Sequence, residues 1–509
     1  MNTKIRRQLR RRKQRIERRL DRANRHGCRQ PMFTASKSHY EIADRVRGLS
    51  SGGIGAIHTL ARQVGLIDAI DERLHLLCFH FPYHESDHVL TFAYNPLCGG
   101  TCLQDLERLR HNEVFLDALG TRRIPDPTTA GDFCRRFDEP SIRLLQDIVH
   151  DVRIGVWGQQ PADFFQQARI DMDGILVETT GQCKQGMDIA YDGTWGYHVL
   201  VLSLANTGEV LSLVNRSANR PSQEGAAAEV DHVLPVLFRG GFQQVLLRGD
   251  TKFSQTEHLD RWHADQRVRF LFGYEALPNL KALAEDLPEN AWQTLQRPPR
   301  YEVQTQPRDR PDNVKEAIVV QREFENIKLR SEQVAEFNYQ PSACRQAYRM
   351  VVVRKNLSVE QGERLLFDRI VYFFYITNDW KSTAAAIVFS ANDRCDQENL
   401  LAQLAGGVRA LRAPVDNLVS NWAYMVMTAL AWDLKAWWAL LLPETPGRWA
   451  ERHRAEKRWV LKLEFRTFVN TFMQLPCQLV RTGRRLLYRL LAWNPYLPIF
   501  FRLLDRLRC

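Results

Sequence analysis

The sequence predicts a mixed α/β protein in which a sheet-forming stretch lies between two helical regions, and three observations support this. Residues 52–150 carry apolar side chains at three- and four-residue steps, as amphipathic helices do. Between residues 168 and 276, segments rich in β-branched and aromatic residues alternate with helical ones, which is typical of a mixed sheet. After residue 416 the pattern is helical again, with many Trp, Leu and Arg residues.

The N-terminal segment 4–25 predicts a basic helix, because it has no Gly or Pro and carries only sparse apolar positions. Residues 1–30 contain 13 Lys and Arg against two acidic residues, and residues 448–509 contain 14 against four. The net charge is +11, so the stretch between the two ends carries about −10. This distribution favours two arms that grip a polyanion, with two solvated basic tails as the alternative.

Several classes of protein are disfavoured by the sequence. Of the ten cysteines only Cys98 and Cys102 form a close pair, without a second pair to complete a zinc site, and reduced thiols indicate a cytoplasmic location. The most apolar segment, 422–442, is interrupted by Asp433 and Lys435, so we expect no membrane span. No glycine-rich phosphate loop occurs, so no nucleotide cofactor is expected.

The helical region before the sheet has clear end signals. Thr128 or Thr129, after Pro127, is the expected N-cap of one helix, and Gly120 the expected C-cap of another. The pattern is compatible with a helix-turn-helix-like module and equally with a plain bundle. The expected helices here are 52–74, 102–120, 128–137 and 141–152.

The central region alternates between strands and helices. The expected strands are 168–179, 196–205, 209–218, 243–250 and 268–276, and the expected helices are 225–240 and 255–265. The alternation then stops in a β-rich stretch with a Pro/Arg-rich piece at 297–313 and strand-like segments at 316–324 and 347–355. It resumes with a strand at 369–379 and one helix at 385–407.

Three carboxylates on separate elements stand out. Asp171 and Asp173 are two residues apart in one expected strand, so they share a face. Asp250 ends a second strand, where α/β sheets place site residues, and Glu398 lies on the later helix. Oxygen ligands of this kind suit Mg²⁺, although salt bridges and helix caps would explain isolated acids equally well.

Longer strings make the assignment more specific. The chain resembles the DDE transposases of bacterial insertion sequences, and most closely the IS1380 group within the IS4-like class. The matching text runs from DMDG at 171–174 through 181–228, and continues in VLLRGDTKFS at 245–254, FFYITND at 373–379 and RCDQEN at 394–399. The resemblance covers roughly residues 50–440, in the order of the family.

The resemblance implies a catalytic role for Asp173, Asp250 and Glu398. These acids would hold two Mg²⁺ or Mn²⁺ ions, with Asp171 as an additional ligand candidate. It also places a signature arginine at Arg394, where it would hold a DNA phosphate or pair with Glu398 one helical turn away. Two signature positions depart from the family, because its Tyr and Lys are replaced by Ala391 and Ala405, which puts a contact with the transposon end in doubt.

The family fold is an RNase H-like mixed sheet with a β-rich insertion before the helix that carries the catalytic Glu. In relatives the insertion sometimes stacks a DNA base on Trp, which makes Trp292 a candidate, with a core position as the favoured interpretation. His198 is interpreted as a structural histidine bonded to backbone rather than as a metal neighbour. Gly249 is expected to give backbone room beside Asp250.

The implied organisation has six parts. They are a basic arm (1–30), a helical DNA-binding region (31–160), the catalytic core in two pieces (161–277 and 366–415), the insertion (278–365) and a basic helical C-terminal region (416–509). Segments 481–493 and 501–508 are expected to be Arg/Leu helices that contact a partner subunit or DNA. The expected DNA contacts are Arg394, Arg6, Arg7, Arg10, Arg11, Arg12, Lys13, Arg484 and Arg485.

The expected function is metal-dependent cleavage at transposon ends, followed by transfer of the 3′-OH into target DNA. Its partners would be double-stranded DNA, both terminal inverted repeats and target, and a second copy of the chain in a homodimeric synaptic complex. The expected location is the bacterial cytoplasm, at the nucleoid. The alternatives are an RNase H-like nuclease without strand transfer and an inactive DNA-binding repressor.

Overall fold

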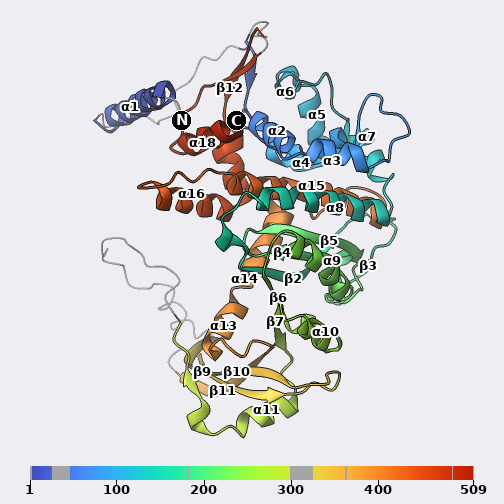
Figure 1. Ribbon diagram of the computed structural model, residues 1–509, viewed down its shortest axis with the longest axis vertical. Helices are drawn as coiled ribbons and strands as arrows, with labels where there is room; N and C mark the ends of the chain where they lie inside the picture. Colours follow the sequence, from blue (N-terminus) through green and yellow to red (C-terminus); the bar gives the residue numbers. More distant parts are fainter. Residues whose placement is uncertain are drawn as a thin grey trace.

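The computed structural model describes residues 3–25, 40, 46–181, 183–297, 325–361, 364–483 and 485–507. Its parts follow one another along the longest axis (Figure 1). Helices from both ends of the chain gather at the top, the first strands of a large sheet lie in the middle, and three long strands lie at the bottom. The acids discussed below therefore lie in the middle of an elongated molecule.

Five strands form the centre of the sheet, in the order β5-β4-β2-β6-β7. β2, β4 and β5 pair antiparallel, whereas β6 and β7 run parallel to β2. This is the strand order of an RNase H-like fold, and it confirms the expected mixed sheet. The strands are β2 (Gln167–Glu178), β4 (Trp195–Leu204), β5 (Glu209–Ser217), β6 (Gln244–Gly249) and β7 (Val268–Tyr274). A short strand, β3 (Asp188–Ile189), pairs with the start of β4 and was not expected.

The same sheet continues beyond β7. β11 (Arg364–Thr377) pairs antiparallel with β7, and β10 (Tyr348–Gln361), β9 (Glu325–Tyr339) and β8 (Gln293–Thr294) follow in order. The strand-like segment 347–355 thus lies in β10, while segment 316–324 lies outside the described residues. The stretch from 278 begins with a helix, α11 (Pro278–Glu285).

The helical region before the sheet agrees with the expected segments in part: a helix at residues 85–97 was not expected, and the expected helices 52–74 and 102–120 are each divided into shorter ones. Its helices are α2 (Ile54–Gln63), α3 (Leu66–Arg73), α4 (Glu85–Leu97), α5 (Leu106–Arg110), α6 (Glu113–Leu119), α7 (Pro127–Cys134) and α8 (Glu139–Trp157). Gly120 caps α6 in the left-handed conformation, at φ +73°, as expected. The N-cap of α7 is Asp126 rather than Thr128 or Thr129, because Pro127 occupies the first helical position and the Asp126 carboxylate accepts both threonine amides.

A central helix, α15 (Leu418–Leu440), joins the helical half to the sheet. It packs against β5, α4, α8 and α16 (Ala450–Lys462), and nearly every one of its side chains is buried. A helix that is buried on all sides is apolar all round, and its Asp433 is paired with Arg153 of α8. None of the described helices is long and apolar enough to cross a membrane.

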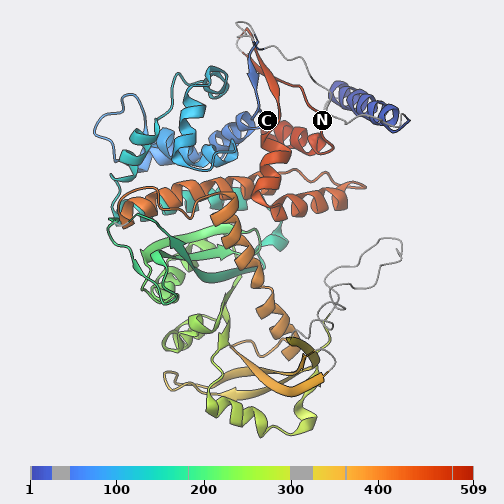
Figure 2. The ribbon, with the colours of Figure 1, turned by 180° about the vertical axis from the view of Figure 1, so that it is seen from behind.

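The expected helix 385–407 is broken into three pieces. α13 (Ala384–Asn392) ends near Asp393, α14 (Cys395–Ala402) begins after Arg394, and a π-helical turn covers Gln403–Gly407. Figure 2 shows this segment, in orange, running down from α15 to the long strands. The break lets α13 pack Ile387 and Val388 into a small apolar cluster with Leu271, Val351 and Val353, while α14 packs on β2.

The C-terminal region differs most from expectation. Segment 481–493 is not a helix, because β12 (Cys477–Thr482) and β13 (Arg485–Leu490) form a hairpin that also pairs with β1 (Gly48–Leu49). In β13 exposed and half-buried side chains alternate at every second residue, which is the pattern of a strand and not of a helix. α18 (Leu497–Leu507) and the N-terminal α1 (Thr3–Arg25) are helices, as expected. In the part of the chain that the structure describes, the remaining α-helices are α9 (Ala226–Arg239), α10 (Leu259–Ala264) and α17 (Phe465–Phe468).

Candidate active site

Two of the expected acids lie side by side on neighbouring parallel strands. Met172 of β2 is opposite Gly249 of β6, so the next residues, Asp173 and Asp250, meet at the carboxyl end of this strand pair. Burial raises the pKa of the Asp173 carboxyl, and the negative charge of Asp250 raises it further. Two carboxylates that repel each other in a half-buried position form a site that a divalent cation would neutralise.

Arg394 joins the break between α13 and α14 to this acid pair. Its guanidinium donates to Asp173, with 3.2 Å between Arg394 Nη1 and Asp173 Oδ2. Both side chains are largely buried, at 17% and 18% exposure, so the ion pair is partly shielded from water. Arg394 therefore contacts the first acid and does not pair with Glu398.

Glu398 lies in the first turn of α14, with an exposed side chain. Its neighbour Gln397 is buried and fixes the helix to β4, donating to the carbonyl of Val201 at 3.2 Å. Val201 is the cross-strand partner of Asp173, so this bond and the Arg394 contact fix the first turn of α14 beside β2 and β4. Within the described part of the chain, Glu398 makes no hydrogen bond or ion pair with Asp173 or Asp250.

Asp171 has a different role from its neighbour on the strand. Both of its carboxylate oxygens accept from Arg248, with Arg248 Nε 2.6 Å from Oδ1 and Arg248 Nη2 2.8 Å from Oδ2. Arg248 also donates to the carbonyl of Ser390 in α13 at 2.8 Å. The pair is almost fully buried, so Asp171 serves as the counterion of Arg248. The sequence offered one indication of this pair, because Arg248 is the single charged residue of a mainly apolar strand and a buried charge requires a partner.

Other residues singled out in the sequence have structural positions. His198 is 5% exposed, and its Nδ1 lies 2.8 Å from the carbonyl of Arg220, as expected for a histidine bonded to backbone. Trp292 is 7% exposed and packs beneath the Arg354 guanidinium, so it is a core residue. At Gly249 a Cβ atom would lie 2.5 Å from Phe253 Cβ, so the glycine gives room to the loop after Asp250. Gly174, beside Asp173, is similarly crowded by the His198 ring.

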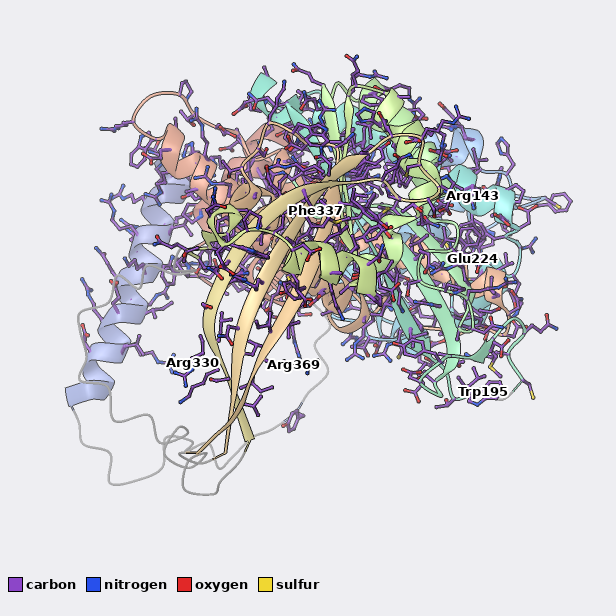
Figure 3. The ribbon with its side chains drawn as sticks, turned by 90° about the horizontal axis from the view of Figure 1, so that it is seen from below. Arg143, Trp195, Glu224, Arg330, Phe337 and Arg369 are labelled. Atoms are coloured by element: carbon purple, nitrogen blue, oxygen red, sulfur yellow. The ribbon has the colours of Figure 1, made fainter. Side chains whose placement is uncertain are left out.

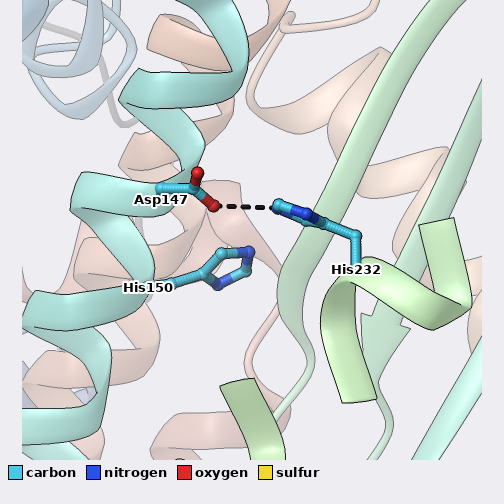
Figure 4. Close-up of side chains that lie close together, drawn as sticks. All are labelled: Asp147, His150 and His232. Carbon is cyan, nitrogen blue, oxygen red and sulfur yellow. Dashed lines mark hydrogen bonds and ion pairs between the residues drawn. The ribbon is translucent and has the colours of Figure 1, made fainter. Parts of the chain in front are cut away.

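A second group of potential metal ligands lies between α8 and α9. The ligand atoms of Asp147, His150 and His232 lie within 4.8 Å of one another (Figure 4). However, Arg153 Nη1 lies 2.7 Å from His150 Nδ1. A guanidinium can only donate, so the neutral ring carries its proton on Nε2 and has no lone pair there for a cation. Burial and the charge of Arg153 also lower the pKa of His150. The group therefore fits a metal ion poorly.

Most of the basic residues expected to contact DNA at the two ends of the chain are exposed, but one of them forms hydrogen bonds within the protein. Arg6, Arg7, Arg10, Arg11 and Lys13 are exposed on α1, and Arg485 is exposed on β13. Arg12 instead anchors α1 to the C-terminal hairpin, donating to the carbonyls of Leu490 and Ala492 at 2.8 and 3.1 Å. Arg484 lies outside the described residues.

The cysteines Cys98 and Cys102 are unpaired, and the Cys102 thiol donates to Asp105.

Comparison with known proteins gives one family match. The family described as Transposase DDE domain group 1 matches residues 44–509, which is most of the chain. No curated protein matches the chain. Among solved structures, the cryo-EM structure of the piggyBac transposase synaptic complex with hairpin DNA aligns at a TM-score of 0.38 and 9% identity, over 83% of this chain and 82% of that one.

Proposed function

Because the chain belongs to the family described as Transposase DDE domain group 1, we propose that it moves a bacterial insertion sequence of the IS1380 group. It nicks DNA at the terminal inverted repeats and exposes a 3′-OH. That 3′-OH then attacks a phosphodiester bond of the target DNA, so one bond is broken for each bond formed. The exchange conserves bond energy and requires no nucleotide cofactor.

The observation that supports this most directly is the pairing of Asp173 and Asp250 at the carboxyl ends of β2 and β6. Their mutual repulsion fits a site for Mg²⁺ or Mn²⁺, with Asp173, Asp250 and Glu398 as the ligands of two ions. Such ions, when bound, activate an attacking oxygen and stabilise the departing one. The protein contributes the parallel strands that fix two of the acids and the helix that carries the third.

Arg394 has a separate role in this proposal. In the DNA-free protein its guanidinium rests on Asp173, and in the working complex it turns to a phosphate oxygen of the DNA. Guanidinium groups bind phosphate through paired hydrogen bonds, which makes arginine suited to this exchange. Arg394 thereby positions the scissile phosphate and keeps the acid pair partly neutralised until DNA arrives.

The DNA duplex is held by the basic surfaces at both ends of the chain. The exposed arginines of α1 and the hairpin that carries Arg485 lie together, because Arg12 joins the two elements. Neutralisation of phosphates by these side chains makes binding fall as salt rises. Two transposon ends must be processed together, so the working assembly is a homodimer on paired ends.

The decisive experiment incubates the protein with the DNA flanking its gene, a target plasmid and Mg²⁺. Joined product supports the transposase, cut product without joining supports a nuclease, and binding alone supports a repressor. Replacing Asp250 with Asn should abolish cutting and joining, because the carboxylate is lost. DNA affinity should stay within about twofold, because Asn has nearly the same volume as Asp and leaves the fold unchanged.

The matched control is Asp265→Asn, which changes an acid of the same domain whose carboxylate binds Arg267. This variant should cut and join like the parent. Cutting by Asp250→Asn at the parental rate would remove Asp250 from the site, and loss of cutting in both variants would show that the assay reports damage to the fold.

A further inference from the structure

The hairpin formed by β3, the turn and the start of β4 (residues 188–195, the aromatic hairpin) exposes three large apolar side chains. Ile189 is 45% exposed, Tyr191 87% and Trp195 52%. Single exposed apolar residues are ordinary on protein surfaces, whereas several on one short element indicate an interaction site. The two acids of the hairpin are occupied, because Asp188 accepts from Asn219 and Asp192 from the Thr194 amide.

Trp195 also forms one wall of a cavity. The cavity has a volume of about 380 Å³, and its other walls are Thr179, Thr180, Gly181 and Met187. This volume lies within the range of small-ligand sites. The indole offers a flat apolar face, and Thr179 and Thr180 add polar side chains to the lining. The Thr179 oxygen accepts from the Gly181 amide and keeps its own proton to donate. A flat apolar face beside polar groups suits a planar heterocycle with polar edges.

Trp195 lies on the same sheet face as Asp173. Asp173 pairs with Val201 across the strands, and Trp195 precedes Val201 by an even number of residues on the same strand. Side chains at even spacing share a face, and six residues of strand cover about 20 Å. One DNA strand advances about 3.4 Å per nucleotide, so this distance corresponds to roughly six nucleotides.

Lys252 links the turn of the hairpin to the loop after Asp250. The Lys252 ammonium lies 5.3 Å from the centre of the Tyr191 ring, and the Lys252 amide donates to Asp250 at 2.9 Å. A cation is thus placed between the aromatic hairpin and the acids, where a phosphate of the same DNA strand would pass. Figure 3 shows Trp195 projecting on the same side of the molecule as the long strands that carry Arg330 and Arg369.

We propose that the aromatic hairpin is a stacking platform for unpaired nucleotides that flank the bond cut at Asp173 and Asp250. This proposal rests on the proposed function and adds a second DNA contact to it. Trp195 and Tyr191 stack on the bases, the threonine hydroxyls bind a base edge in the cavity, and Lys252 contacts the connecting phosphate. Aromatic stacking of this kind tolerates any base, so the platform recognises unpaired DNA and not a particular base sequence.

The test compares two DNA probes of the same sequence in EDTA, so that no cleavage is needed. One probe is a blunt duplex, and the other ends in a single-stranded overhang of about six nucleotides that contains 2-aminopurine. We expect Trp195→Ala to weaken overhang binding about ten- to hundredfold and to leave the blunt-duplex Kd within about twofold. The quenching of 2-aminopurine seen with the parent should disappear, whereas Trp195→Phe should retain most of it.

The matched control is Trp380→Ala, because Trp380 is also 52% exposed but does not line the cavity. It should bind both probes like the parent. Equal effects of Trp195→Ala and Trp380→Ala, or equal losses on both probes, would overturn the platform. An unchanged Kd with weaker self-association in sedimentation would assign the surface to a second copy of the chain and also overturn it. A parent that binds overhangs through Trp195 but never cuts with Mg²⁺ would instead refute the proposed function alone.

Discussion

Asp171 and Asp173 show how two identical residues on one strand face acquire different roles. Asp171 is 1% exposed, and both of its oxygens accept from the buried Arg248. Asp173 is 18% exposed and lies beside Asp250, and its two oxygens accept from Arg394 and from the Gly174 amide. The buried Asp171 carboxylate serves as the counterion of Arg248, whereas Asp173 shares its position with a second acid whose charge repels it. The difference arises from what lies across the sheet, since the local sequence around the two acids is nearly the same.

We predict that Asp171→Asn destabilises the fold while Asp173→Asn does not. Loss of the Asp171 charge leaves Arg248 buried without a counterion, which should lower the free energy of unfolding by about 3–5 kcal/mol. Asp173→Asn should change it by less than about 1 kcal/mol, because burial and the charge of Asp250 already disfavour the ionised form of Asp173, and should abolish cleavage. Urea denaturation of the two variants measures both values, and equal stabilities would contradict the structural role of Asp171.

At the scale of elements, the C-terminal hairpin shows where a local pattern is ambiguous. The Leu and Arg residues of 481–493 fit a helical stripe and an alternating strand about equally well over so short a stretch. The strand conformation is favoured because β12 pairs with β1, which lies more than 400 residues earlier in the chain. The hairpin then presents the Leu490 and Ala492 carbonyls that receive Arg12 of α1.

We predict that Arg12→Ala releases α1 from the hairpin and that Arg11→Ala does not. Arg12 makes two hydrogen bonds to carbonyls, whereas Arg11 is exposed. Loss of these charged hydrogen bonds should speed hydrogen exchange of the α1 amides about tenfold. Arg11→Ala should leave exchange unchanged and reduce DNA affinity at low salt. Faster exchange in both variants would show that α1 is not held through Arg12.

At the scale of the whole molecule, the helical half contains histidines that folding keeps neutral. Burial lowers the pKa of His58, His88 and His150, on α2, α4 and α8. For His88 the value falls to about 4, and the ring stacks on Phe133 with 4.2 Å between centroids. Because the unfolded chain takes up these protons first as pH falls, stability is complete above about pH 6.5 and is lost as the pH drops toward 4.

We predict that His88→Phe reduces this acid sensitivity. Phenylalanine keeps the stack on Phe133 and removes His88 Nδ1, which is buried without a hydrogen-bond partner. Between pH 7 and pH 5 the parent should lose about 2 kcal/mol more of unfolding free energy than the variant. Denaturation curves at the two pH values provide the measurement. Parallel pH profiles for the two proteins would place the acid sensitivity elsewhere.

The sequence by itself determined the positions of the five central strands along the chain, the location of Asp173, Asp250 and Glu398 on separate elements, and the basic ends of the chain. These features depend on periodicity, composition and family strings, which are local properties. It left undecided whether Arg394 pairs within its helix, and it did not reveal the break before α14 or the partner of Arg248.

Only the tertiary structure decided which charges meet. Arg248 and Asp171 are 77 residues apart, and Arg394 and Asp173 are 221 apart. Their pairing depends on strand register and on the packing of α13 and α14 against the sheet. Local sequence patterns cannot predict it, because the two partners lie far apart in the chain. The aromatic hairpin likewise gains its meaning from the fold, since Trp195 acquires a cavity and a shared face with Asp173 only when β2 and β4 pair.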